Sequence, residues 1–82
     1  MYEIEYSKKA EKFIKKLPKN KQIQILSVLE RTRIRPEKHF ERLVGQKTYK
    51  LRVGDYRIII DVDTTIKILR ILKVGNRKKI YD

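Results

Sequence analysis

The sequence has 82 residues, with 22 lysines and arginines against 10 acidic residues and a formal net charge of +12. A net positive charge this large destabilises the folded chain by repulsion between the cations, so such proteins usually bind a polyanion. Nucleic acid, acidic protein and anionic membrane are the candidates. The absence of cysteine excludes disulfides and thiolate metal sites. The apolar fraction of 40% suffices for one two-layer core, so we expect residues 1–82 to form a single domain.

The first half of the sequence predicts one strand followed by two helices. Residues 2–6 alternate apolar with acidic side chains, as in a half-buried strand, and Ser7 can cap a following helix. One face of that helix carries Ala10, Phe13, Ile14 and Leu17. Pro18 ends it, and Asn20 can cap a second helix. The apolar residues of the second helix are Ile23, Ile25, Leu26, Val28 and Leu29. The short connection predicts an antiparallel pair.

The second half predicts strands. Residues 34–45 have the composition of a loop, and three β-branched-rich runs follow over residues 46–53, 56–63 and 65–74. Short turns between the runs predict an antiparallel meander, and residues 75–82 form a basic tail. The order β-α-α-β-β-β predicts a small α+β domain, an antiparallel sheet with an αα-hairpin packed on one face. No apolar run reaches the ~20 residues of a membrane span, and no signal peptide is evident, so we expect a cytoplasmic protein.

The stretch YKLRVGDYRIII, residues 49–60, carries a cluster of cations. Alternation about the Gly-Asp turn places one set of apolar residues toward the helices: Tyr49, Leu51, Val53, Tyr56, Ile58 and Ile60. Lys50, Arg52 and Arg57 then share the open face of the sheet. In the final strand Arg70 interrupts an expected apolar face of Ile66, Ile68, Leu72 and Val74. Either a bulge or a buried partner for Arg70 must resolve this conflict.

The residue inventory excludes several chemistries. With no cysteine and with His39 alone, a histidine metal site and a Ser-His-Asp triad are both unconvincing, and we expect His39 on a surface loop. Asp61 and Asp63 border a turn, where aspartate is common, and no Gly-rich phosphate loop is present. The remaining cations suit a phosphodiester. Because RNA carries its own 2′-hydroxyl nucleophile, a metal-free protein could cleave it, although a binding surface without chemistry is equally compatible.

The hairpin YKLRVGDYRIII together with the terminal VGNRKKIY resembles the RelE/ParE superfamily of toxins from prokaryotic type II toxin–antitoxin systems. Members of the RelE-like branch are ribosome-dependent endoribonucleases that cut mRNA without metal or cofactor, by 2′-OH attack leaving a 2′,3′-cyclic phosphate. The resemblance implies a catalytic set of Lys50, Arg52, Arg57, Arg77 and Tyr81. The implied RNA-binding set is Lys47, Lys50, Arg52, Arg57, Arg77, Lys78 and Lys79.

The resemblance also assigns roles. Arg57 is expected to stabilise the transition state and Arg77 to assist the leaving 5′-oxygen. Lys50, Arg52 and Tyr81 are expected to act on the 2′-hydroxyl and to stack on or orient the substrate. Because arginine is a poor base, the proton of the 2′-hydroxyl is expected to pass to Lys50 or Tyr81, and the choice between them stays open.

Two alternatives remain within this reading. ParE-type members poison DNA gyrase and generally lack the catalytic set, so its presence favours the nuclease. A non-catalytic basic RNA-binding module is the other alternative. The expected partners are an acidic RelB-like antitoxin, in a higher-order complex, and the ribosome with its mRNA, but not a membrane.

Overall fold

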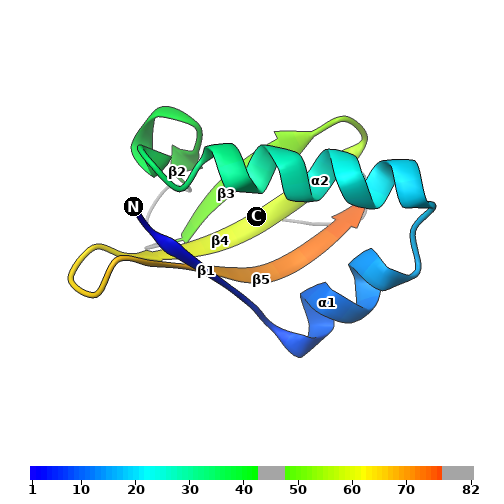
Figure 1. Cartoon of the computed structure of the whole chain (residues 1–82), viewed down its shortest axis with the longest axis horizontal. Helices are drawn as coiled ribbons and strands as arrows, with labels where there is room; N and C mark the ends of the chain where they lie inside the picture. Colours follow the sequence, from blue (N-terminus) through cyan, green and yellow to red (C-terminus); the bar gives the residue numbers. More distant parts are fainter. Residues whose placement is uncertain (43–47, 77–82) are drawn as a thin grey trace.

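The computed structural model describes residues 1–42 and 48–76 (Figure 1). Its elements are strand β1 (Glu3–Tyr6), helices α1 (Lys8–Lys15) and α2 (Lys19–Arg31), the 3₁₀ helix η1 (Pro36–Lys38), and strands β2 (Glu41–Arg42), β3 (Thr48–Val53), β4 (Tyr56–Asp63) and β5 (Ile68–Asn76). The predicted order of long elements is confirmed. The short η1 and β2 lie within the segment predicted to be a loop, and β5 begins and ends later than predicted. Over the described ranges, neither α1 nor α2 combines the length and apolar character needed to cross a membrane.

The described strands form one sheet in the order β1-β5-β4-β3-β2. Strands β3, β4 and β5 are antiparallel neighbours, which confirms the predicted meander. The sheet is nevertheless mixed rather than wholly antiparallel, because β1 pairs with β5 in parallel. The helices return the chain to the end of the sheet where β1 starts, and the amide of Tyr2 donates to the carbonyl of Arg33 at 2.8 Å. From that end β3 runs in the direction of β1, β4 reverses, and β5 restores it (Figure 1).

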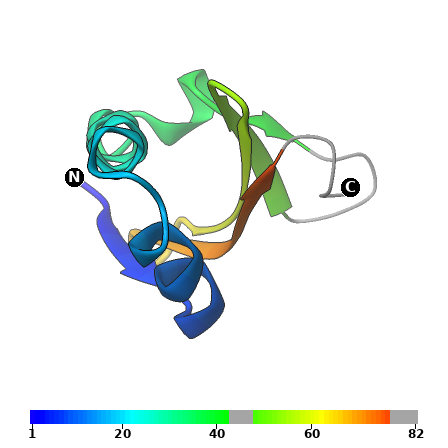
Figure 2. The ribbon, with the colours of Figure 1, turned by 90° about the vertical axis from the view of Figure 1, so that its right-hand side faces the viewer.

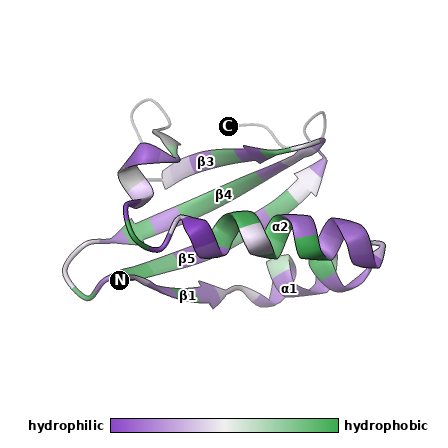
Figure 3. Cartoon of the chain, turned by 45° about the horizontal axis from the view of Figure 1, so that its top comes forward, coloured by the Kyte–Doolittle hydropathy of each residue, from purple (hydrophilic) through white to green (hydrophobic). Residues whose placement is uncertain are grey.

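Both helices cover the same face of the sheet (Figure 2). The core between the two layers includes Ala10 and Ile14 from α1, Ile25 and Leu29 from α2, and residues of β3, β4 and β5. Apolar residues are concentrated along β4 and β5, the strands at the centre of the sheet (Figure 3). Not all the apolar residues of α2 are buried, since Ile23 and Leu26 are 55% and 38% exposed.

The two helices begin differently from each other. Ser7 caps α1 as predicted, because its Oγ accepts a hydrogen bond from the amide of Ala10 at 3.0 Å. The predicted cap at Asn20 is wrong. Pro18 occupies the N-cap position of α2, and its carbonyl accepts from the amides of Lys21 and Gln22 at 2.9 and 3.0 Å. Asn20 therefore lies within the first turn of α2, where its side chain is exposed.

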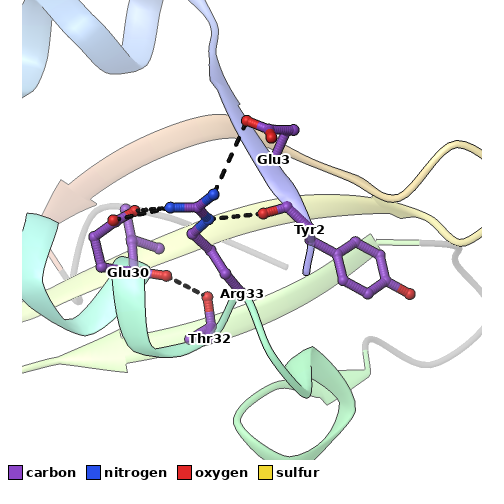
Figure 4. Close-up of polar contacts among 6 residues, drawn as sticks. Tyr2, Glu3, Glu30, Thr32 and Arg33 are labelled. Carbon is purple, nitrogen blue, oxygen red and sulfur yellow. Dashed lines mark hydrogen bonds and ion pairs between the residues drawn. The ribbon is translucent and has the colours of Figure 1, made fainter.

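Arg33 fastens the end of α2 to the edge strand β1 (Figure 4). Its Nε donates to the carbonyl of Tyr2 at 2.7 Å, and its Nη1 pairs with the carboxylate of Glu30 at 3.0 Å. Because the Arg33 carbonyl also accepts from the Tyr2 amide, both backbone groups of Tyr2 are satisfied. This part of the sheet edge is thereby closed to pairing with another strand.

A β-bulge in β5 resolves the conflict at Arg70. The register steps from Ile59 opposite Lys73 to Ile60 opposite Ile71, which leaves Leu72 as an extra residue. The core residues of β5 are Leu69, Ile71 and Val74. The predicted core face was therefore wrong except at Val74, and Ile66 is 55% exposed. Arg70 lies on the open face, so it does not interrupt the core.

Ser7 also supports the bulge. Its amide donates to the carbonyl of Ile71 at 2.9 Å, and its Oγ donates to the carbonyl of Leu72 at 2.8 Å. A bulge disrupts the ladder locally, and a backbone carbonyl removed from water needs another partner. One hydroxyl thus caps α1 as an acceptor and satisfies the bulge as a donor.

Variants at Ser7 separate these two roles. We expect Ser7→Ala to lower the free energy of unfolding by about 1–2 kcal/mol, because it removes both hydrogen bonds. Ser7→Thr keeps a donor and an acceptor and is expected to stay near wild type. Ser7→Asp keeps the capping acceptor but cannot donate to Leu72 when ionised, so we expect clear destabilisation. Urea unfolding at neutral pH measures all three, and an aspartate variant as stable as wild type would show that the Leu72 bond contributes nothing.

Candidate nucleic-acid interface

The β3–β4 hairpin brings three cations together on the open face of the sheet. Arg52 lies directly opposite Arg57 in the ladder, and Lys50 lies opposite Ile59. Their strand neighbours Leu51, Val53 and Ile58 point into the core, so alternation directs the cations away from the helices. We refer to Lys50, Arg52 and Arg57 as the hairpin cluster. The structure places all three where the sequence pattern predicted.

The turn at Gly54-Asp55 sets this register. Gly54 has φ of +57°, a left-handed conformation that glycine adopts without steric cost. Glycine at the first central position of a two-residue loop is typical of a type II′ turn. A Cβ at this position would lie 3.3 Å from Nε2 of Gln24 on α2. The turn therefore passes close to α2. It sets the register in which Arg52 and Arg57 lie directly opposite each other on neighbouring strands.

The hairpin cluster concentrates positive charge. Arg52 is exposed, whereas Lys50 and Arg57 are half-buried. Like charges directly opposite one another destabilise a strand pair by up to about 1 kcal/mol, and an anion bound between them reverses the sign of that interaction. Guanidinium groups bind phosphate oxygens through paired, charge-assisted hydrogen bonds. By its chemistry this surface suits a phosphate group.

Lys73 lies beside the hairpin cluster and was missed in the sequence. It is opposite Ile59 on β5, so Lys50, Ile59 and Lys73 form one row across three strands. A regular β5 would have given Lys73 the same direction as Ile71, into the core. The sequence does contain one indication of the irregularity in β5. Arg70 and Lys73 are charged residues three positions apart, and a regular strand would have to direct one of them into the core.

The open face carries the opposite charge further along the strands. Arg70 pairs with Glu5 at 3.5 Å, Asp61 at 3.6 Å and Asp63 at 3.7 Å. We refer to these four residues as the Arg70 cluster. Three carboxylates surround one guanidinium, so the cluster has a formal charge of −2. The ion pairs join β1, β4 and β5 and leave a net acidic region beside the cationic one.

The helical side has a separate apolar cavity of about 240 Å³. Its lining residues are Tyr6, Glu11, Ile14, Lys15, Gln22 and Leu26. Burial raises the pKa of the Tyr6 phenol, and the nearby carboxylate of Glu30 raises it further. Since both helices lie on the face opposite the hairpin cluster, an occupant of this cavity would approach the protein from the other side.

The other predicted site residues lie outside the described residues: Lys47, Arg77, Lys78, Lys79 and Tyr81. The structure therefore assembles three members of the predicted catalytic set, the hairpin cluster. His39 is exposed at the end of η1, in the segment that leads into β2, as predicted for a loop residue at the surface. Within residues 1–42 and 48–76, no group of three or more histidine or acidic side chains is arranged to hold a metal ion.

Comparison with known proteins supplies a family and a fold. The family model of the ParE toxin of type II toxin–antitoxin systems (parDE) matches residues 4–81. A chain of the archaeal RelE–RelB complex from Pyrococcus horikoshii OT3 is similar, with TM-score 0.82 and 29% identity over 96% of this chain and 98% of that one. A chain of the RelB–RelE antitoxin–toxin complex from Methanococcus jannaschii has TM-score 0.70 and 25% identity, covering 94% of both chains.

A chain of the intact E. coli RelBE toxin–antitoxin complex shares the fold, with TM-score 0.80 and 22% identity over 93% of this chain and 96% of that one. Sequence comparison with curated proteins gives no match.

Proposed function

The chain belongs to the ParE toxin family of type II toxin–antitoxin systems, within the RelE/ParE superfamily, and we propose that it is a ribosome-dependent endoribonuclease that cleaves mRNA without a metal ion. The observation that carries this proposal is the hairpin cluster. Lys50, Arg52 and Arg57 converge on one face of a fold that a RelE–RelB complex shares.

The proposed reaction uses the ribose 2′-hydroxyl of the substrate as nucleophile. A bond forms between the 2′-oxygen and the adjacent phosphorus while the bond to the 5′-oxygen breaks, which leaves a 2′,3′-cyclic phosphate and a 5′-hydroxyl. The 2′-hydroxyl proton passes to a base, for which Lys50 and Tyr81 are the candidates, and the leaving 5′-oxygen takes up a proton from water.

The cations have separate roles in this reaction. Arg52 and Arg57 neutralise the additional negative charge of the pentavalent phosphorane, the largest electrostatic change along the path. Arg77 is proposed to stabilise the leaving oxygen. Lys47, Lys78 and Lys79 are proposed to bind flanking phosphates.

An antitoxin is the proposed protein partner. The similar archaeal chains come from complexes with RelB. With a net charge of +12, this chain favours an acidic, RelB-like partner, and a higher-order complex of the two is proposed. The proposed substrate, mRNA on the ribosome, places the toxin in the cytoplasm.

Inhibition of DNA gyrase is the second candidate, and it is favoured by one observation: the matching family model is that of the ParE toxin. A non-catalytic basic RNA-binding module is the third. Mapping of mRNA 5′ ends in cells arrested by induced expression tests the nuclease directly. New 5′ ends within translated regions are expected. Supercoiling inhibition of purified gyrase, without new 5′ ends, would support the second candidate, and harmless expression without an antitoxin would support the third.

A further inference from the structure

The bulge in β5 changes the charge of the open face. Up to Ile71, side chains of β5 alternate regularly between core and open face. The extra residue Leu72 shifts this alternation, so that Val74 enters the core and Lys73 is exposed on the open face. Bulges are over-represented next to functional sites, where they redirect a side chain. Here the redirected side chain is a cation beside the hairpin cluster.

Ser7 holds this arrangement in place. Its hydroxyl donates to the carbonyl of Leu72, and its amide donates to the carbonyl of Ile71, immediately before the extra residue. The direction of Lys73 is therefore set by hydrogen bonds from the junction of β1 and α1. It does not depend on the conformation of a loop.

The row containing Lys73 has an apolar centre. Ile59 is only 9% exposed although it lies on the open face, outside the core between the sheet and the helices. Lys50 and Lys73 flank it on the neighbouring strands. Lysine side chains can lay their aliphatic stems along such a residue. The row thus places two lysines on the open face with one strand between them.

The Arg70 cluster limits where an anion can lie. Asp61 is two residues from Ile59 along β4, about 7 Å away at the rise of a strand. A phosphate placed on that row would face the net acidic Arg70 cluster. A phosphate placed between Lys50 and Lys73, or beside Arg52 and Arg57, would face cations, although Glu41 of β2 is the register partner of Lys50 at the far end of that row. The charge pattern therefore favours a path across the strands, from β3 to β5, over a path along them.

We propose that Lys73 is a further RNA-contacting residue. It binds a backbone phosphate of an RNA chain that runs across the sheet from the hairpin cluster toward β5. The identity of the ligand rests on the proposed function, whereas the position of Lys73 rests on the bulge. One phosphate contact contributes about 0.7 to the slope of log K against log salt for a single-stranded nucleic acid.

The test compares two lysines of equal charge on opposite faces. The purified toxin is titrated with a fluorescent single-stranded 2′-O-methyl RNA, which lacks the free nucleophile and cannot be cleaved by 2′-OH attack. We expect Lys73→Gln to reduce the salt slope by about 0.7 and the affinity about fourfold near 0.15 M salt. Lys12→Gln changes an exposed lysine of α1, in the helical layer, and is expected to leave both unchanged. Lys73→Arg should restore the slope.

The outcomes separate the two proposals. If wild type binds RNA but Lys73→Gln and Lys12→Gln give equal slopes, the inference is overturned and the proposed function is untouched. If wild type fails to bind the free RNA, the inference about Lys73 is overturned, whereas the proposed function, which depends on the ribosome, is decided by the mapping of mRNA 5′ ends. Unfolding midpoints of the two variants in urea confirm that any difference comes from binding, since neither lysine is buried.

Discussion

Replacing Arg57 with alanine is expected to lower the rate of mRNA cleavage by about 10²–10³-fold, and to abolish growth arrest, while the protein stays folded. Removal of one preorganised donor to a transition-state oxyanion typically has an effect of this size. Arg57 is half-buried and lies opposite Arg52, so its side chain is directed to the open face beside a second guanidinium. Arg57→Lys keeps the charge but loses the paired donors, and we expect an intermediate rate. Single-turnover cleavage of ribosome-bound mRNA measures the three rates.

The matched control is Arg31→Ala. Arg31 is exposed at the end of α2, and its Nε donates to the carbonyl of Ser27 at 3.5 Å. The change removes the same charge from the helical side of the protein, so a general effect of net charge would appear in both variants. Equal cleavage by Arg57→Ala and Arg31→Ala would sink the assignment of the hairpin cluster as the site.

The buried residues of β3, β4 and α1 could be predicted from local patterns in the sequence. Alternation in β3 and β4 placed Leu51 and Ile58 in the core, and the helical period placed Ile14 there. The parallel pairing of β1 was not predictable in this way. It depends on the route by which the helices return the chain, which the contact between Tyr2 and Arg33 closes at long range. No residue of β1 itself encodes the direction of its neighbour.

The candidate site likewise has a part that local patterns predict and a part that depends on long-range contacts. The hairpin cluster was predictable because a two-residue turn fixes the register, and the register fixes which side chains share a face. Lys73 was not predictable, because its direction depends on the bulge at Leu72. The hydrogen bond from Ser7 to Leu72 joins residues 65 positions apart in the chain. A local reading of β5 assumes regular alternation, and here that assumption put the wrong residues in the core.

Replacing Ile60 with alanine is expected to inactivate the protein by a different route, through stability. Ile60 is fully buried on β4, paired with Tyr49 on one side and Ile71 on the other. Truncation to alanine at such sites costs about 2–5 kcal/mol, since the surrounding residues collapse only partly into the space. A domain of this size has a total stability of about 4–12 kcal/mol, so the variant loses a large share of it. The midpoint of thermal unfolding is expected to fall by about 10–30 °C.

The control for Ile60 is the same substitution at Ile66, which is 55% exposed in the turn before β5. Ile66→Ala is expected to shift the midpoint little, because its side chain is already largely in water. Ile60→Val removes one methylene and should cost about 0.5–1.5 kcal/mol. Cleavage by Ile60→Ala should recover on cooling as the folded fraction rises, whereas Arg57→Ala stays slow at every temperature. If Ile60→Ala and Ile66→Ala unfold at the same temperature, β4 is not at the centre of the core.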